Sequence, residues 1–172
     1  KVIPNYIDID KYTYKSRKHI KPNLFWVRSI HNIYNPIMAV YVLYQLKKIY
    51  PNASLCMVGP IKDFKVMQKL NNKINSLNLK SSVSFTGHLP KEQWIELSCN
   101  YDIFINTTNY DNTPVTIIEA MALGLPIVST NVGGMPKLIK HDYNGKLVNA
   151  NDTLGMIECI RQYVEDEKQL LY

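Results

Sequence analysis

Short runs of apolar and β-branched residues alternate with longer, more polar segments from Leu24 onward. The runs contain few polar positions, which is typical of strands buried on both faces of a parallel sheet. Six strands are predicted: Leu24–Val27, Ser54–Val58, Val83–Thr86, Asp102–Asn106, Ile127–Ser129 and Lys146–Val148.

The segments between these strands have the spacing of helices and carry helix start and stop signals. Asn35-Pro36 and Thr113-Pro114 each place a capping side chain before a proline in the first turn. Gly124, directly after a leucine, predicts a helix end. Helices are predicted near residues 36–49, 61–78, 90–99, 114–123, 134–140 and 152–167.

The regular alternation predicts a doubly wound, Rossmann-like α/β fold, a three-layer sandwich in which a parallel sheet lies between two helix layers. Open sheets of this kind bind ligands at the carboxyl ends of their strands. The loops at that edge are therefore the candidate site, and they follow Val27, Val58, Thr86, Asn106 and Ser129.

Composition divides the chain into two parts. Residues 1–23 are rich in Lys, Tyr and Asn and contain Pro4 and Pro22, which predicts an interdomain linker. Residues 24–172 carry the strand–helix pattern, and 172 residues with 46% hydrophobic content suffice for one ordinary domain. Because the chain has no initiator Met, we expect a part excised from a longer protein.

The net charge of +6 suits anionic partners: nucleotide phosphates, nucleic acid or an acidic membrane surface. The lysines form no long basic run, which argues against nucleic acid. Cys56, Cys99 and Cys159 lack disulfide-framework or zinc spacing, so reduced thiols in the cytoplasm are expected. No apolar run reaches the ~18 residues of a membrane span, and the first residues do not form a signal-peptide pattern.

The segment NTTNYDNTPVTIIEAMALGLPIVSTNVGG holds the densest candidate chemistry. Asp111 lies in a loop, and Glu119 lies inside the helix predicted to start at Pro114. The free N–H groups of Val115 and Thr116 at such a helix start suit a phosphate. Glu119 lies about 7.5 Å further along the axis, at roughly 1.5 Å per residue, where a carboxylate suits ribose hydroxyls. Spacing alone leaves two interpretations open: a ribose ligand or an ordinary helical glutamate.

Other motifs add little. Gly133 and Gly134 follow a strand at the ligand edge, but the same letters suit a tight turn, and neither GxGxxG nor GxxxxGK[ST] occurs. The four histidines show no metal-ligand spacing, so no metal site is predicted. The sequence contains no GxSxG motif and no Ser-His-Asp arrangement.

Together these motifs resemble family 4 retaining glycosyltransferases of the GT-B fold. The run from Asp111 to Gly134 is similar to the family signature: an acidic residue, seven residues, Glu, then AMAxGxPVVxTxxGGxPE. KVIPNYIDIDKY resembles the linker into the nucleotide domain, WVRS the first strand with its phosphate-binding Arg, and VSFTGHLP the motif VxFxGxxP. LCMVGP and YNGKLV also fit, so the resemblance covers nearly the whole chain. It implies the C-terminal, nucleotide-sugar-binding half of a two-domain enzyme.

The resemblance also implies roles for individual residues. Glu119 would bind the ribose hydroxyls of the donor, and Asp111 the hydroxyls of its sugar. Arg28 would pair with the diphosphate, because a guanidinium fork suits phosphate oxygens; these three are the expected catalytic residues. Gly87 and His88 would lie near the base. Backbone around the sugar and phosphate would come from Asn112, Thr113, Pro114, Val115 and Thr116.

Three positions depart from the family pattern. The family has a Lys five residues after the Arg, where this chain has Ile33, so one phosphate cation is missing. His31 or a shifted Lys is the candidate substitute. Asp111 is one methylene shorter than the usual Glu, and Lys137 stands where the family has an acidic residue after GGxP.

The resulting hypothesis is retaining transfer of a sugar from a nucleoside-diphosphate sugar to an acceptor. The donor is a substrate, and no tightly bound cofactor is expected. The acceptor, a sugar or lipid-linked glycan of cell-surface polysaccharide synthesis, would be held by an N-terminal domain absent from this chain. We expect a cytoplasmic protein, with peripheral association of the full-length enzyme at the inner face of the membrane.

Two alternatives belong to other classes. One is a non-catalytic Rossmann-like binding module with a decayed site, and the other is a different GT-B enzyme, such as a nucleotide-sugar epimerase or a sugar phosphorylase. The spacing of the two carboxylates before AMALGLP favours the transferase over the other enzymes. A nucleotide titration separates it from a decayed module, which would bind nothing.

Overall fold

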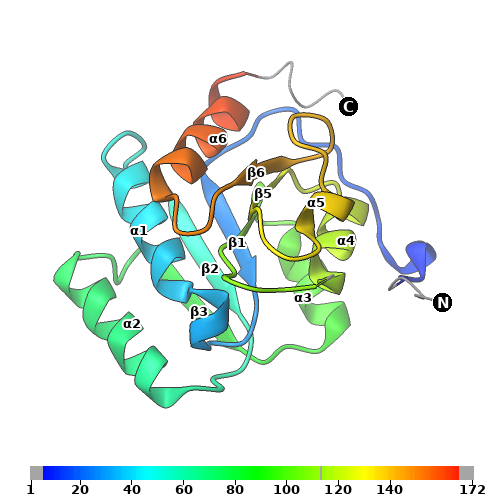
Figure 1. Ribbon diagram of the computed structural model, residues 1–172. Coiled ribbons are helices and arrows are strands. Elements are labelled where there is room, and N and C mark those ends of the chain that lie inside the picture. Colours follow the sequence, from blue (N-terminus) through cyan, green and yellow to red (C-terminus); the bar gives the residue numbers. More distant parts are fainter. Residues whose placement is uncertain (1–5, 113, 167–172) are drawn as a thin grey trace.

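The computed structural model describes residues 6–112 and 114–166 and contains a six-stranded parallel sheet (Figure 1). The spatial order of the strands is β3-β2-β1-β4-β5-β6. This order confirms the predicted doubly wound α/β fold, because the chain moves outward from β1 to one edge and then returns to build the other half. The strands are β1 (Asn23–Val27), β2 (Ser54–Val58), β3 (Val83–Gly87), β4 (Ile103–Asn106), β5 (Ile127–Thr130) and β6 (Lys146–Val148).

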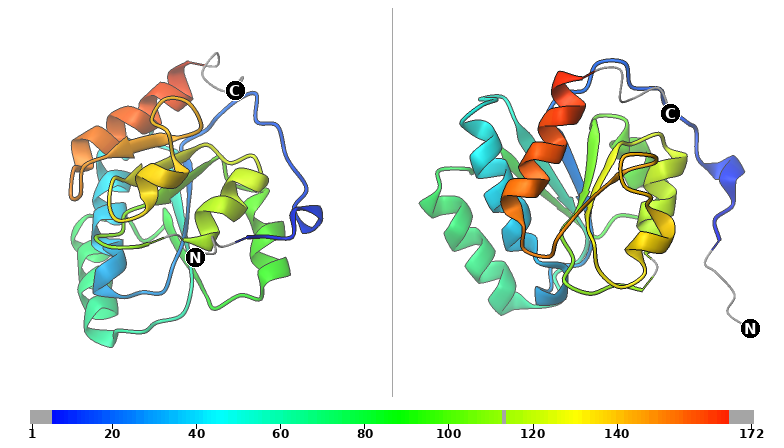
Figure 2. Two further views of the ribbon diagram at one scale, coloured as in Figure 1. Left: turned by 45° about the vertical axis from the view of Figure 1, so that its right-hand side comes forward. Right: turned by 45° about the horizontal axis from the view of Figure 1, so that its top comes forward.

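Helices cover both faces of the sheet (Figure 2). The layer formed by α1, α2 and α6 packs on one face, and the layer formed by α3, α4 and α5 packs on the other. Two short 3-10 helices, η1 (Ile9–Lys11) and η2 (Asn32–Tyr34), lie in loops. The α-helices are α1 (Pro36–Lys47), α2 (Phe64–Ser76), α3 (Lys91–Ser98), α4 (Val115–Ala122), α5 (Met135–Leu138) and α6 (Thr153–Glu165).

Local capping sets the helix starts and explains where they differ from the predicted ones. The Asn35 side chain accepts the Met38 N–H, so α1 begins at Pro36 as predicted. Asp63 accepts the N–H groups of the second and third residues after it, which places the start of α2 at Phe64 rather than near residue 61. Pro114 is the cap of α4 rather than its first residue. Thr113, the predicted capping side chain, lies outside the described residues.

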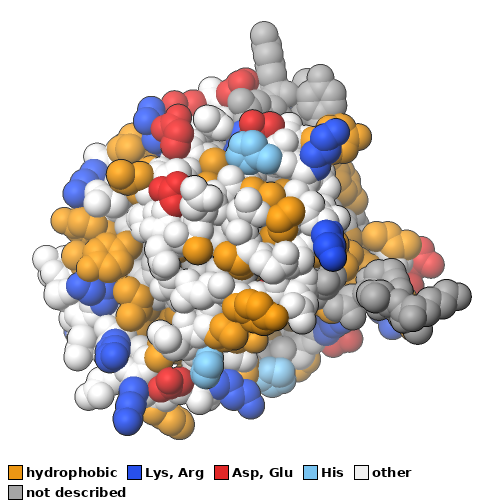
Figure 3. All heavy atoms as spheres, in the orientation of Figure 1, with side chains coloured by type: hydrophobic (Ala, Val, Ile, Leu, Met, Phe, Trp, Pro, Cys, Tyr) orange, Lys and Arg blue, Asp and Glu red, His pale blue; other side chains and the backbone are white. Residues whose placement is uncertain are grey.

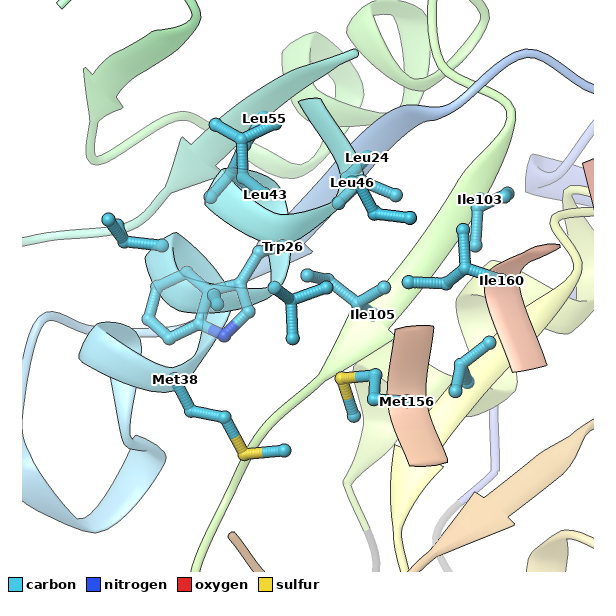
Figure 4. Close-up of a cluster of buried hydrophobic side chains, with 14 of the residues drawn as sticks. Leu24, Trp26, Met38, Leu43, Leu46, Leu55, Ile103, Ile105, Met156 and Ile160 are labelled. Carbon is cyan, nitrogen blue, oxygen red and sulfur yellow. The ribbon is translucent and has the colours of Figure 1, made fainter. Parts of the chain in front are cut away.

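The sheet separates two apolar clusters because successive strand residues point to opposite faces. From β1, Leu24 and Trp26 enter the cluster under α1, α2 and α6, while Phe25 and Val27 enter the one under α3, α4 and α5. Figure 4 shows the first cluster, in which side chains of α1 and α6 meet Trp26 and Ile105. The indole Nε1 of Trp26 donates to the hydroxyl of Thr107 at 3.0 Å, so this ring is buried without an unsatisfied donor.

The segment predicted as a linker packs against the domain over its described part, residues 6–22. Tyr12, Arg17 and Ile20 are buried. Arg17 donates to the carbonyl oxygen of Leu123 at 2.8 Å and to that of Tyr101 at 3.2 Å, and burial lowers the pKa of its guanidinium. Composition alone did not reveal these contacts, because polar and aromatic residues are as common in packed segments as in linkers.

None of the described helices combines the length and the apolar character that a bilayer span requires.

Candidate functional site

The polar groups singled out in the sequence converge at the carboxyl edge of the sheet. A cleft of about 250 Å³ lies there between the loops that follow β1, β2 and β3. Arg28 comes directly after β1, His88 directly after β3, and Thr116 lies in the first turn of α4. The cleft therefore brings together three of the predicted binding residues from distant parts of the chain.

Arg28 is a largely buried cation, with its side chain 11% exposed. Its Nη1 donates to the Thr116 hydroxyl, and its Nη2 lies 3.1 Å from Oδ2 of Asp111. That ion pair is not aligned as a hydrogen bond, and within the described part of the chain Nε and Nη2 have no hydrogen-bond partner. The guanidinium also lies over the ring of Tyr34, 5.5 Å from its centroid.

Burial lowers the pKa of Arg28, and the nearby carboxylate of Asp111 works against that effect. A guanidinium stays charged in proteins, so it must be compensated by neighbours or by a ligand. The two nitrogens that lack an aligned hydrogen bond among the described residues mark this position as one that can accept a further anion.

The start of α4 lies against the same arginine. Pro114 provides no side-chain cap, so the first N–H groups of the helix lack the partner that a capping residue supplies. The N–H groups of Val115 and Thr116 belong to this first turn, where the helix dipole favours an anion. Arg28 and the helix start therefore act on one small volume.

Glu119 lies one turn further along α4 and is only 2% exposed. Its Oε1 accepts a hydrogen bond from the Tyr12 hydroxyl at 2.8 Å and is paired with Nζ of Lys91 at 2.7 Å. The hydrogen bond to Glu119 raises the pKa of Lys91, while burial and then Glu119 raise the pKa of Tyr12. Glu119 is thus not an ordinary exposed helical residue, and both of these contacts from described residues are made to Oε1.

The loop that carries Asp111 is held in place by its backbone. The N–H of Gly134 donates to the carbonyl oxygen of Asp111 at 3.0 Å. Gly133 has φ +54°, and a Cβ there would lie 1.8 Å from the same oxygen. The hydroxyl of Thr130 donates to the carbonyl oxygen of Thr108 at 2.6 Å. Of the two glycines that the sequence left ambiguous, Gly133 is therefore needed for close approach to the Asp111 loop, whereas Gly134 contributes a backbone N–H.

The remaining predicted residues take varied positions. Gly87 ends β3, and its carbonyl oxygen accepts the N–H of Gly59 at 2.8 Å. Asn112 is exposed beside Asp111. His31, the candidate substitute for the missing Lys, caps η2 by accepting the N–H of Ile33 through Nδ1. Lys137 is exposed on α5.

Sequence reasoning missed three residues of this site: Tyr12, Tyr34 and Lys91. Each reaches a predicted residue across the fold, and no local pattern marks such a contact. The proximity of Lys91 to the VSFTGHLP motif was the one available signal, because that motif was already expected at the ligand edge.

A larger cavity of about 720 Å³ lies at the opposite, amino edge of the sheet. Its lining includes Tyr14, Arg17 and Tyr163, and it contains none of the residues gathered around Arg28. Among the described residues, no group of three or more His, Cys, Asp or Glu side chains has the arrangement of a metal site. Size therefore does not identify the candidate site; the convergence of charged groups does.

An open parallel sheet, helices on both faces and a charged cleft at the carboxyl edge define a Rossmann-like α/β domain. The sequence model of the family "Glycosyl transferases group 1" matches residues 13–171, and the chain belongs to this family. Its structural neighbours are glycosyltransferases of the GT-B fold.

Relatives and solved structures agree with this assignment. An Escherichia coli UDP-Gal:alpha-D-GlcNAc-diphosphoundecaprenol alpha-1,3-galactosyltransferase is 24% identical over 182 residues, covering 96% of this chain and 45% of that protein. HepE of Anabaena in complex with UDP-glucose superposes with a TM-score of 0.88 at 21% identity, covering 99% of this chain and 49% of that one.

The C-terminal domain of LpcC, a group 1 glycosyl transferase of Francisella tularensis, has a TM-score of 0.83 at 16% identity. That match covers 96% of this chain and 91% of that domain. The chain spans less than half the length of curated relatives that it matches, for example 29% of one and 45% of another.

Replacing Gly133 by Ala is expected to destabilise the domain more than replacing Gly87 by Ala. Both glycines have positive φ, so both variants bear a strain of roughly 1–2 kcal/mol. Only Gly133→Ala also drives a Cβ into the Asp111 carbonyl, which adds about 1–3 kcal/mol of overpacking. Urea unfolding of both variants measures the difference, and equal losses would show that the close approach is not required.

Replacing Tyr12 by Phe is expected to lower the free energy of unfolding by about 1.5 kcal/mol, because a buried bond to a carboxylate is lost. Tyr14→Phe is the matched control, since Tyr14 is 67% exposed. The same urea titration applies to both. Identical stability of the two variants would mean that the segment around Tyr12 does not pack on Glu119.

Proposed function

We propose that this chain binds the nucleoside-diphosphate sugar donor of a retaining glycosyltransferase. The observation that carries the proposal is the largely buried Arg28, which reaches the first turn of α4 through Thr116 and keeps two donor nitrogens without a hydrogen-bond partner among the described residues. A buried cation beside a helix N-terminus suits a diphosphate better than a neutral or cationic ligand.

In this proposal the diphosphate binds to Arg28 and to the first N–H groups of α4. Transfer breaks the bond between the anomeric carbon of the sugar and a phosphate oxygen, so negative charge grows on the leaving diphosphate. A fixed guanidinium and fixed backbone donors stabilise that charge without having to reorganise. Ile33 leaves the site without the lysine of the family pattern, so Arg28 carries a larger share of this stabilisation.

Glu119 would accept hydrogen bonds from the ribose hydroxyls. Its contacts with Tyr12 and Lys91 hold the carboxylate through Oε1, and the ligand would bind at Oε2. The two contacts also explain why the structure tolerates a buried carboxylate in α4, since an unpaired charge there would be costly. Lys91 and Tyr12 are positioning residues in this account.

Asp111 would contact the donor sugar, with the base near Gly87 and His88. In the structure its carboxylate pairs with Arg28, so it occupies part of the volume assigned to the phosphates. Donor binding then requires Asp111 to turn from the guanidinium toward the sugar hydroxyls. The neighbouring backbone from Asn112 to Thr116, including Thr113, would surround sugar and phosphate.

The whole protein is proposed to be the two-domain enzyme that the resemblance implies, with residues 1–23 joining an acceptor-binding domain to this donor-binding one. The LpcC C-terminal domain, of which this chain covers 91%, supports that division. The Escherichia coli relative, whose name specifies a diphosphoundecaprenol-linked acceptor, supports a lipid-linked glycan as the acceptor class. A cytoplasmic location at the inner membrane face and a role in cell-surface polysaccharide synthesis are part of the same proposal.

A decayed binding module is the second candidate, because Ile33 replaces the expected lysine. The incompletely hydrogen-bonded Arg28 and the paired, buried Glu119 favour a functional site, since decay removes the pressure to keep buried charges. A different GT-B enzyme would share the donor site and differ in the domain that this chain does not include.

Calorimetric titration of the chain with UDP, GDP, ADP, CMP and their sugars tests the donor site and identifies the base. Arg28→Gln is expected to weaken the best of these ligands by about tenfold to a hundredfold, the equivalent of a charged hydrogen bond worth about 1.5–3 kcal/mol. Arg161→Gln is the matched control, because Arg161 pairs with Glu158 and Glu165 on the surface of α6.

Binding that survives Arg28→Gln unchanged, or that falls equally in Arg161→Gln, would contradict the proposal. No binding of any nucleotide to the folded wild-type chain would favour the decayed module instead.

A further inference from the structure

Charge is distributed very unevenly along the chain. Residues 11–80 contain thirteen Lys and Arg and a single acidic residue, Asp63. Residues 81–172 contain six basic residues and eleven acidic ones. The moderate net charge of +6 therefore conceals two halves of opposite sign.

Part of this positive half lies together on one side of the molecule, whereas Lys15 and Arg17 belong to the N-terminal segment, which packs at the ends of α3 and α4. Residues 23–76 form β1, α1, β2 and α2, which lie together because α1 packs against α2. Figure 3 shows lysines along the lower left margin of the molecule, where Figure 1 places α2. We call this surface the basic face; it consists of Lys48, Lys62, Lys65, Lys69 and Lys73.

The one carboxylate within this region is already engaged. Asp63 caps α2 by accepting the N–H groups of Lys65 and Val66 at 2.9 and 3.1 Å. Lys62, Lys65 and Lys69 are exposed, so their ammonium groups are available to a partner. The basic face thus presents a positive field that its own elements do not neutralise.

Apolar side chains project among these lysines. Phe64, the first residue of α2, is 78% exposed, and Ile61 beside it is 40% exposed. Tyr41 of α1 is 37% exposed and lies under the Nζ of Lys73, 4.9 Å from the ring centroid. Exposed aromatic and aliphatic side chains within a lysine-rich surface suit a lipid bilayer, which has anionic headgroups at its surface and apolar acyl chains beneath them.

This combination favours a lipid bilayer over nucleic acid. All five cations of the basic face are lysines, which bind phosphates as point charges and lack the planar fork that reads bases. The start of α2 is also at the carboxyl edge of the sheet, since Ile61 forms a β-bridge with Ile30, two residues after Arg28. A bilayer that contacts Phe64 would therefore lie near the mouth of the candidate site.

We propose that the basic face docks this domain on the surface of an anionic lipid bilayer, with Phe64 entering the headgroup region; this inference rests on the membrane location in the proposed function and assigns a surface to it. The docking surface shares no residue with Arg28, Asp111 or Glu119. Its failure and the failure of the donor site are therefore separate experimental outcomes.

Co-sedimentation of the chain with vesicles tests the proposal. One set contains phosphatidylcholine and phosphatidylglycerol in a two-to-one ratio, and the other contains phosphatidylcholine alone. The chain is expected to bind the anionic vesicles and to be released by added salt, because exposed charges are screened. The triple variant Lys62→Gln, Lys65→Gln and Lys69→Gln is expected to bind about a hundredfold more weakly, at roughly 1 kcal/mol for each lysine near an anionic surface.

A matched triple variant controls for net charge: Lys11→Gln, Lys137→Gln and Lys140→Gln, at exposed positions on or beside η1 and α5. It is expected to bind within a fewfold of wild type, and Phe64→Ser is expected to weaken binding at unchanged charge. Far-UV circular dichroism confirms that each variant is folded.

If the two triple variants lost vesicle binding equally, net charge alone would explain the binding, and the proposal would be overturned. So would binding to both vesicle sets alike. Tight binding of a mixed-sequence single-stranded DNA, measured by fluorescence anisotropy in the same buffer and without vesicle binding, would assign the basic face to nucleic acid instead.

Discussion

A guanidinium removed from water sets the architecture of the candidate site. Burying a charge is tolerated only when partners replace its hydration, and Arg28 has three: the Asp111 carboxylate, the Thr116 hydroxyl and the Tyr34 ring. Each partner comes from a different loop or helix, so the position of the charge depends on the fold as a whole. The compensation is incomplete, since two donor nitrogens have no hydrogen-bond partner among the described residues. That incompleteness is what makes the position suitable for an anion.

The second buried charge links more of the chain to the same edge. Glu119 links α4 to two other parts of the chain: to α3 through Lys91, and to the N-terminal segment through Tyr12. A displacement of that segment would therefore break a hydrogen bond to the carboxylate, although Tyr12 and Glu119 are 107 residues apart in sequence. The two charged clusters are coupled along α4, because Thr116 and Glu119 lie one turn apart. A ligand that contacts both clusters would therefore be bound along a single short helix.

The fold was predictable because its signals are local. Continuous apolar runs marked the strands, and Asn35-Pro36 marked the start of α1. The site was predictable only in part. Asp111, Glu119 and Arg28 lie in motifs, whereas Tyr12 and Lys91 acquire importance only through contacts across the fold. Glu119 is an example. Its spacing from Asp111 was compatible with a ribose ligand and with an ordinary helical glutamate, and its burial beside Tyr12 and Lys91 excludes a solvent-exposed glutamate. Ile33 contributes through its backbone, because its carbonyl oxygen accepts a hydrogen bond from the Asn109 N–H at 2.8 Å.

We propose that Arg28 exchanges the Asp111 carboxylate for a diphosphate. A crystal structure of the chain with the nucleoside diphosphate that binds most tightly would test this exchange. We expect phosphate oxygens within hydrogen-bond distance of Nε and Nη2 of Arg28 and of the first N–H groups of α4. Asp111 is expected to have moved away, and the ribose to lie at Glu119. A nucleotide bound in the cavity at the amino edge, with the pair of Arg28 and Asp111 intact, would contradict it.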